Sequence, residues 1–432
     1  MRLQEFLIEL KRLKKSWTAN KILKNTDLLS INFENFIKNN KNIFIGNNIA
    51  IAVSGGADSL ALAILANKFK DKYNYKLIAF SVDHQLRKEA AQEVEYVKSL
   101  MKGLDIAHHT LVWTEKKPKT KIQETARIAR YDLLSEACNK YQCDCILLGH
   151  HADDQVETFI IRLEANSGLD GLCCMQEKTK ILTSYGQINL IRPLLTIRKK
   201  NLIEECEKNN TVWMEDPSNI DIKYSRSKIR KLLINIDIFE NFDKSITLFS
   251  KLRLIIDKII FNNMKNSIQF NETGVCKMSL ESFIKLPNIF QKKLLNTLIK
   301  IVGGKKYPRK NSIINGVVEK IISLERKNTT VGGVYIIMNK TSILMSRQLD
   351  NSVKINNLIN YKNLWDRRFI VCNNTKNKNI TIGPLGEKDY LLMIKLNKIV
   401  KPSINFNAIK TIPTIRLLEE IVSIPHLLYW KS

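Results

Sequence analysis

The sequence predicts an α/β protein with a doubly wound, mostly parallel sheet, followed by a helical domain and a small α+β or β-rich C-terminal domain. Short apolar runs alternate with helix-like segments from about residue 48 to residue 150, which is typical of a parallel sheet covered by helices on both faces. Polar motifs follow the ends of three of these runs, where ligands bind in such sheets. Beyond Lys231 this alternation ends, which predicts accessory domains of a different architecture.

The elements of the first part follow from their apolar patterns and from the residues that bound them. Buried strands are expected at residues 49–53, 77–82, 106–113 and 145–148, because each apolar run is short. Helices are expected at residues 60–69, 89–103 and 123–141 and from Ala152 onward. Gly103 stands where the second of these helices should stop.

The segment after the first strand has the sequence Ser54-Gly55-Gly56-Ala57-Asp58-Ser59. Its glycines let the backbone approach a ligand closely, and the start of the following helix favours a phosphate group. The two serines add hydroxyl groups, and Asp58 can hold a magnesium ion against phosphates. The segment lacks the Gly-Lys-Ser/Thr end of a Walker loop and is not the Gly-x-Gly-x-x-Gly dinucleotide motif. It therefore predicts an ATP site, and the alternative is an ordinary serine-capped turn.

Histidines and carboxylates follow the fourth strand. On a helix that starts near Ala152, Asp154 and Glu157 share a face and Asp153 lies beside them. Together with His150 at the strand end, these groups suit a metal ion or an amine ligand. The alternative is an acidic first turn that complements the helix dipole.

Two groups of arginines are candidates for binding phosphates. Arg127 and Arg130 lie three positions apart on the third helix and can point together at a phosphate, although a solvated helix face is the alternative. Further along, Pro217 interrupts regular structure, and a basic cluster that includes Arg226 and Arg230 follows it.

Composition indicates a globular protein with a polyanionic partner. The 432 residues include 69 Lys+Arg and 42 Asp+Glu, a formal charge of +27. This excess favours nucleic acid as the partner, and a general lysine and asparagine bias is the alternative. The sequence has no apolar run long enough for a membrane span and no secretory signal at residues 1–17, so a cytoplasmic location is expected. The 8 cysteines lack zinc spacing and are expected to be reduced and mostly buried.

Together these motifs resemble the tRNA(Ile)-lysidine synthetase family of the PP-loop ATP pyrophosphatase superfamily. The resemblance covers residues 48–230 and rests on motifs in the same order and spacing, at residues 54–59, 82–87, 123–131, 148–158, 168–172, 192–195 and 215–219. Glu164-Ala165-Asn166 and Ser227 depart from the family pattern, which puts local tRNA or ligand contacts in question.

The resemblance implies four parts of the chain. An N-terminal helical extension at residues 1–45 precedes an adenine nucleotide alpha hydrolase-like catalytic domain at residues 46–232. A helical tRNA-binding domain with a hairpin follows at residues 233–350, and a small tRNA-binding domain at residues 351–432. Within these accessory domains the patterns predict helices at residues 234–262 and 288–301 and a hairpin of residues 332–337 with 342–345. A basic, asparagine-rich stretch at residues 358–382 is expected to precede a β-rich module.

The family's reaction uses ATP and Mg²⁺ to join L-lysine to the wobble cytidine of a tRNA(Ile) with a CAU anticodon. The cytidine is adenylated first, pyrophosphate and then AMP leave, and the lysidine formed changes codon reading from AUG to AUA. The resemblance implies that ATP is bound by residues 54–59, His84 and His150, with magnesium held by Asp58. It implies catalytic roles for Asp58, Arg127, Asp154 and Glu157. Lysine or tRNA contacts fall to Asp153, Asp154, Glu157, Arg130, Arg226 and Arg230, and a homodimer is also expected.

Two other functions are compatible with the same motifs. An ATP-dependent tRNA thiolase would share the adenylation step and would need a cysteine such as Cys143 to carry sulfur, so cysteine-to-serine variants distinguish it. A non-catalytic RNA-binding protein with a degenerate nucleotide fold would show no turnover of ATP to AMP.

Overall fold

The computed structural model describes residues 25–85, 90–114, 120, 122–214, 229, 239–305, 309, 311–323, 328–350, 353, 355–357, 362–373, 379–400 and 405–431. The chain divides into two compact units, Met1–Lys251 and Leu252–Ser432. The domain boundaries expected at residues 45, 232 and 350 stay predictions. Among the described residues, no helix is both long and apolar enough to cross a membrane.

A six-stranded sheet in the order β3-β2-β1-β4-β6-β5 forms the centre of the first unit. Neighbouring strands run parallel except for β5, which pairs antiparallel with β6 at one edge. The strands are β1 (Asn48–Ala52), β2 (Lys76–Asp83), β3 (Ala107–Val112), β4 (Cys143–Leu147), β5 (Lys178–Thr183) and β6 (Gly186–Ile191). This confirms the predicted fold class and the four expected strands, while the β5–β6 hairpin is an addition that the sequence patterns did not predict.

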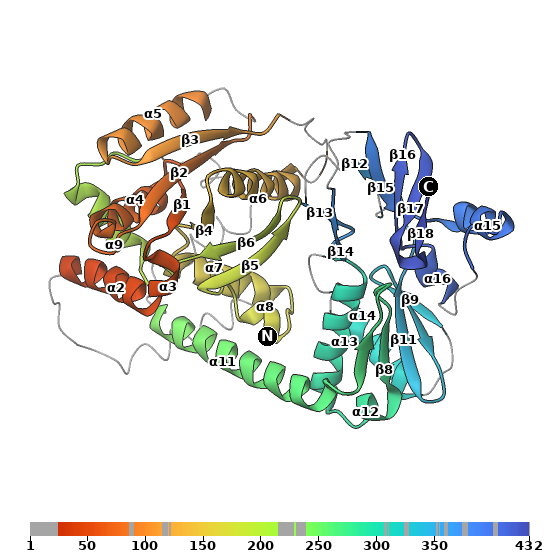
Figure 1. The fold of residues 1–432 in the computed structure, drawn as a ribbon. Coiled ribbons are helices and arrows are strands. Elements are labelled where there is room, and N and C mark those ends of the chain that lie inside the picture. The colour runs from red at the N-terminus through yellow and green to blue at the C-terminus, as the bar shows by residue number, and fades with distance from the viewer. Residues whose placement is uncertain are drawn as a thin grey trace. The chain divides into compact units, whose positions relative to one another are not determined.

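Helices cover both faces of this sheet (Figure 1). Because side chains alternate along a strand, Ile49 and Ile51 of β1 join a core with α2, α4, α5 and α9, whereas Ala50 and Ala52 join a core with α6. The apolar character of α4 on nearly every side follows from its burial in the first of these cores. The helices are α2 (Asn25–Asn39), α3 (Lys41–Phe44), α4 (Ala57–Phe69), α5 (Ala90–Gly103), α6 (Ile122–Lys140), α7 (Ala152–Glu164), α8 (Leu169–Leu172) and α9 (Lys199–Lys208).

The described residues of the second unit form two five-stranded antiparallel sheets and a short hairpin. The first sheet has the order β7-β8-β11-β10-β9, from β7 (Ile268–Phe270), β8 (Cys276–Ser279), β9 (Thr329–Val331), β10 (Val334–Met338) and β11 (Ser342–Arg347). The second has the order β12-β15-β16-β17-β18, from β12 (Asn356–Asn357), β15 (Ile380–Pro384), β16 (Pro413–Leu417), β17 (Glu420–Ile424) and β18 (Tyr429–Trp430). The hairpin pairs β13 (Lys362–Trp365) with β14 (Phe369–Cys372). The helices are α12 (Leu280–Ile284), α13 (Asn288–Val302), α14 (Asn311–Ile322), α15 (Glu387–Lys395) and α16 (Phe406–Ile409), with the 3-10 helix η3 (Pro425–Leu427).

The expected elements of this half of the chain have mixed outcomes. The β10–β11 hairpin and α13 confirm two of them. The single helix α11 (Phe239–Met264) covers most of the predicted helical region 234–262. The predicted β-rich module closes the chain as the sheet that contains β15 to β18, but β-structure begins earlier than expected, because β13, β14 and the start of β15 lie inside residues 358–382. The many lysines and asparagines of this stretch made its short strands hard to recognise in the sequence, as for β14 with its alternating exposure.

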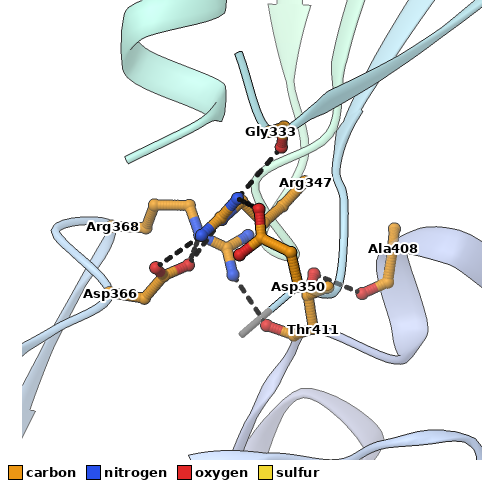
Figure 2. A network of polar contacts seen from close by, with 7 residues as sticks. All are labelled: Gly333, Arg347, Asp350, Asp366, Arg368, Ala408 and Thr411. Atoms are coloured by element: carbon orange, nitrogen blue, oxygen red, sulfur yellow. Dashed lines mark hydrogen bonds and ion pairs between the residues drawn. The ribbon is translucent and has the colours of Figure 1, made fainter. Parts of the chain in front are cut away.

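A buried network of charged side chains connects separate segments of the second unit (Figure 2). Arg347, at the end of β11, contacts both carboxylate oxygens of Asp366, at 3.0 Å from Nε and 3.2 Å from Nη2. Arg368 donates from Nε to the same carboxylate at 2.8 Å and from Nη2 to the carbonyl oxygen of Thr411 at 2.7 Å. The network therefore joins β11, the β13–β14 turn and the segment before β16 through one aspartate.

Candidate nucleotide site at the carboxyl edge of the sheet

The candidate site lies where the order of the strands reverses. β1 pairs in parallel with β2 on one side and with β4 on the other, so the loops that follow β1 and β4 leave the sheet next to each other. In open α/β sheets this is the position where ligands bind. The segment 54–59 and the polar segment 149–157 are thus brought together, as the sequence predicted.

The loop after β1 is shaped by its own backbone and by one serine. Gly55 has a φ of +87°, a conformation that glycine adopts without strain, and its carbonyl oxygen accepts from the amide of Met214 at 3.0 Å. The Ser59 hydroxyl lies 2.9 Å from the Gly56 carbonyl oxygen and 3.1 Å from the Ser54 amide. Ser59 is buried and stabilises the loop, whereas Ser54 is exposed, with its hydroxyl 3.3 Å from that of Ser59. Ala57 and Asp58 then open α4 and direct its first-turn amides toward the same place.

Gly149, two residues after the end of β4, allows this loop to approach the first turn of α4. A Cβ atom on Gly149 would lie 2.9 Å from the carbonyl oxygen of Asp58 and 3.1 Å from the amide nitrogen of Ser59. Both are backbone atoms, which cannot rotate away as a side chain can. The close approach of α4 to the end of β4 therefore requires glycine at this position.

We expect Gly149→Ala to damage the site. The added methyl group forces the start of α4 away from β4, which should cost roughly 1–3 kcal/mol of stability and lower ATP turnover on the order of 10²-fold, since a shift of about 1 Å suffices for that. Urea unfolding and AMP formation measure the two effects. Gly316→Ala is the control, because nothing lies within 4 Å of its added Cβ on α14. Equal behaviour of both variants would contradict the packing argument.

The acidic group converges on His151, a residue that was not among the predicted site residues. The Nε2 atom of His151 lies 3.5 Å from Oδ2 of Asp58 and 3.6 Å from Oδ2 of Asp154, and its Nδ1 lies 3.6 Å from Oδ2 of Asp153. The ring is almost completely buried, at 1% exposure. Burial alone would lower the pKa of His151, but Asp153, Asp58 and Asp154 raise it to about 10. His151 is thus an imidazolium that links the phosphate loop to the acidic turn of α7.

The predicted ATP ligand at this position was His150, which is half-buried in the structure. The sequence shows two adjacent histidines, and which of them turns inward depends on the backbone before α7. His151 occupies the residue position that precedes the helix, with extended backbone angles. The signal available in the sequence was the position of His151 directly before Ala152, where the helix was expected to start.

The three predicted carboxylates of α7 differ in their surroundings. Burial would raise the pKa of Asp153, but His151 lowers it, together with the Lys199 amide that donates to Asp153 at 2.8 Å and the Arg198 Nε at 3.5 Å. Asp154 accepts from the amide of His151 at 3.2 Å and so caps the helix. Glu157 is buried, at 2% exposure. Asp153 and Asp154 lie in the first turn of α7, as the alternative of an acidic turn that complements the helix dipole requires, and both also lie close to His151.

We expect His151→Leu to weaken the fold in a pH-dependent manner. Loss of the cation leaves three carboxylates together, which should cost about 2 kcal/mol, less than for a fully buried pair because the carboxylates are partly exposed. The pKa of His151 is raised on folding, to about 10, so its stabilising contribution is complete below pH ~6.5 and is lost as the pH rises through 10. Denaturant unfolding of the wild type between pH 7 and 10.5 should show this loss, and the variant should lack it.

His109→Leu is the control for that experiment. His109 stacks on Tyr141 at 4.3 Å between ring centroids, and burial lowers its pKa, so it changes charge below this pH window. A pH profile of His151→Leu that matched both the wild type and His109→Leu would contradict the assignment of an imidazolium.

The other predicted ligands lie around the same edge. His84 follows β2, is half-buried and packs edge-on against Trp113 at 5.9 Å. Arg127 is exposed, with its guanidinium 5.2 Å from the ring centroid of Tyr131, and Arg130 is half-buried on the same helix, where burial lowers its pKa. Arg226 and Arg230 lie outside the described residues, as does the segment 215–219.

Asp58 is the carboxylate that the site offers a magnesium ion, because its side chain is the most exposed of the three around His151. The described residues contain no cluster of three or more His, Cys, Asp or Glu side chains arranged to hold a metal ion. Asp58 has a side chain 31% exposed, so it can still take part in binding. Magnesium commonly binds through one or two carboxylates with phosphate oxygens and water completing the shell. The residues present therefore fit a metal ion that arrives with ATP.

Comparison with known proteins agrees with this geometry. Residues 26–236 match the PP-loop domain family, so the first unit carries the domain of that class. The tRNA(Ile)-lysidine synthase of Rickettsia bellii (strain RML369-C) is 32% identical over 413 residues, which covers 93% of this chain and 95% of that protein. The protein of the same name from Rickettsia felis is 31% identical over 419 residues with the same coverage. The chain belongs to the tRNA(Ile)-lysidine synthase family.

Among solved structures, similarity extends to a U34-tRNA thiolase from Methanococcus maripaludis with a [4Fe-4S] cluster. The two share 17% identity with a TM-score of 0.41, over 51% of this chain and 79% of that one. A likeness of this extent does not bear on function. In this chain none of the 8 cysteines forms a disulfide bond, and six are buried, as expected from the sequence.

Proposed function

We propose that the protein uses ATP to join L-lysine to the wobble cytidine of a tRNA(Ile) with a CAU anticodon, through an adenylated cytidine. The observation that carries this proposal is the contact of His151 with Asp58 on one side and with Asp154 on the other. The phosphate loop and the carboxylates that suit an amine are thus separated by a single side chain, that of His151. The similarity to lysidine synthases along 93% of the chain supports the same reaction.

The first half of the reaction takes place at the phosphate loop. The backbone amides of residues 54–59 and the start of α4 hold the phosphates of ATP, and the Ser54 hydroxyl adds a donor. The ring carbonyl oxygen of the cytidine attacks the α-phosphate and pyrophosphate leaves. Adenylation is needed because this oxygen is otherwise a poor leaving group. A magnesium ion held by the phosphates and Asp58 would supply positive charge at the α-phosphate, and Arg127 would add to it.

The second half uses the carboxylates of α7. The lysine amine must be held close to the activated ring carbon and must lose a proton when it attacks, which is work for Asp154 and Glu157. Asp153, oriented by the amide of Lys199, helps to keep the turn in place. AMP then departs and lysidine remains.

The basic character of the chain suits tRNA as its partner. A formal charge of +27 favours contacts with the phosphate backbone, which give affinity that falls as salt is added. The unstacked bases of an anticodon loop are the parts of an RNA that proteins read specifically. The proposal also includes three expectations from the family. These are lysine or tRNA contacts of Arg226 and Arg230, a cytoplasmic location and a homodimer.

Release of AMP with different RNA substrates tests the proposal. The purified protein is incubated with ATP, Mg²⁺, lysine and a tRNA(Ile) transcript with the anticodon CAU, and a matched transcript with UAU serves as the control. We expect AMP formation with CAU and little with UAU. AMP formation that requires a sulfur donor and disappears in Cys143→Ser would favour a thiolase, and absence of any AMP would favour a non-catalytic RNA-binding protein.

A further inference from the structure

The peptide group that joins Gly55 to Gly56 is held from outside the phosphate loop. The Ser59 hydroxyl fixes peptide groups on either side of it, through the Ser54 amide at 3.1 Å and the Gly56 carbonyl oxygen at 2.9 Å. The carbonyl oxygen of Gly55 instead accepts from the backbone amide of Met214 at 3.0 Å. A residue far along the chain therefore holds the central peptide group of the loop.

This contact sets the direction in which the Gly56 amide points. In a trans peptide group the C=O and N–H bonds point in opposite directions. Because the Gly55 carbonyl oxygen is turned toward Met214, the N–H group of Gly56 is turned away from Met214. Gly56 directly precedes the first residue of α4, so this N–H group can join the first-turn amides that attract a phosphate.

Glycine at both positions makes the opposite orientation of this peptide group accessible. Gly55 has a φ of +87° and Gly56 a φ of −76°. A half-turn of the peptide group would give Gly56 a positive φ, which glycine adopts as readily as a negative one. The flipped group would direct the partly negative carbonyl oxygen of Gly55 at a bound phosphate, which it would repel. An external contact is therefore needed to hold the orientation that binds phosphate.

The segment that contains Met214 is itself held in place by α5. The Tyr96 hydroxyl of α5 donates to the carbonyl oxygen of Val212 at 2.7 Å. Met214 packs against the core to which α4 and α5 contribute. A Cβ atom on Gly55 would lie 3.2 Å from Cγ2 of Val97 on α5 and 3.3 Å from Cε of Met214, so both side chains flank the loop. These contacts keep the Met214 amide at the Gly55 carbonyl oxygen.

We propose that Met214 is a positioning residue for ATP. Its backbone amide keeps the central peptide group of the phosphate loop in the orientation that binds phosphate, and the Tyr96 hydroxyl keeps the Met214 segment in place. This inference deepens the proposed function and rests on it, because it concerns the same ATP site. Loss of the Met214 amide should weaken ligands that carry phosphates and should spare those that lack them.

Met214→Pro and Met214→Ala form a matched pair. Both variants lose the thioether side chain, and only proline also lacks the backbone N–H group. Their dissociation constants for a non-hydrolysable ATP analogue with Mg²⁺ and for adenosine are measured by calorimetry. We expect Met214→Pro to bind the analogue roughly 10-fold to 100-fold more weakly than Met214→Ala, as for loss of a charge-assisted hydrogen bond. Adenosine has no phosphate, so both variants should bind it equally.

Tyr96→Phe provides a second test that does not depend on the folding of Met214→Pro. It removes only the hydroxyl group that holds Val212, and we expect about 3-fold weaker binding of the analogue with unchanged binding of adenosine. Tyr73→Phe is its control and should bind both ligands as the wild type does. The Tyr73 hydroxyl contacts Glu34 at 2.7 Å, and Tyr73 precedes β2, at the amino edge of the sheet.

Three results would overturn the proposal. The first is equal affinity of folded Met214→Pro and Met214→Ala for the analogue. The second is a loss of adenosine affinity as large as that for the analogue, which would indicate general damage to the site. The third applies if Met214→Pro does not fold, and is equal binding of the analogue by Tyr96→Phe and Tyr73→Phe. None of these measurements needs tRNA or lysine, so failure of the proposed function would appear separately, as normal ATP binding without lysine on the RNA.

Discussion

We expect the Asp58→Ala variant to release pyrophosphate from ATP at least ~10³-fold more slowly than the wild type. Asp58 lies in the first turn of α4, where the phosphates of ATP would meet the helix, and it is the most exposed carboxylate of the group around His151. Its removal takes away the protein's contribution to holding a magnesium ion against the phosphates. Pyrophosphate release in the presence of tRNA and lysine measures the effect.

A second aspartate provides the control for this variant. Asp144 is exposed on β4, within the strand and not at its carboxyl end, so Asp144→Ala should release pyrophosphate at the wild-type rate. Both variants should be checked for folding by circular dichroism, since Asp58 also contacts His151. Normal pyrophosphate release by folded Asp58→Ala would remove Asp58 from the mechanism.

The second large effect is expected in the other unit, from Asp366→Ala. This change leaves the side chains of Arg347 and Arg368, which are 1% and 5% exposed, without the carboxylate that both contact. Breaking a buried ion pair by removing one partner typically costs about 3–5 kcal/mol, because the remaining charge cannot regain its solvation. Asp350, 3.4 Å from Arg347, can replace only part of the lost contact. Urea unfolding of the full chain measures the loss.

The exposed pair Glu420 and Lys431 gives a matched comparison. Their side chains are 63% and 42% exposed, so solvent screens this ion pair and Glu420→Ala should destabilise the protein far less than Asp366→Ala. If Asp366→Ala destabilised the protein no more than Glu420→Ala, the network in Figure 2 would not hold the segments of this unit together.

The central sheet could be predicted from the sequence because its signals are local. Strands such as β1 and β4 are short apolar runs, and Gly55 and Gly56 mark a close turn before a helix. Alternation of strands and helices implies parallel pairing, and parallel pairing places the loop 54–59 and the acidic turn at one edge. The meeting of these two segments was therefore predictable without knowing any distance.

The details that could not be predicted depend on contacts between distant residues. Adjacent His150 and His151 are equivalent in pattern, and only the packing of α7 against the phosphate loop determines which one is buried between carboxylates. In the second unit, Asp366 lies in a turn with a φ of +46° between two short strands, and nothing in its sequence surroundings indicates that it binds two arginines.

The transfer of lysine to the RNA tests the account most directly. The protein would be incubated with ATP, Mg²⁺, radiolabelled lysine and the tRNA(Ile) transcript with a CAU anticodon, and the label on the purified RNA counted. We predict label that depends on ATP, that is absent with the UAU transcript and that is lost in Asp58→Ala. AMP formation without label on the RNA would contradict lysine as the nucleophile, while leaving the nucleotide site at residues 54–59 in place.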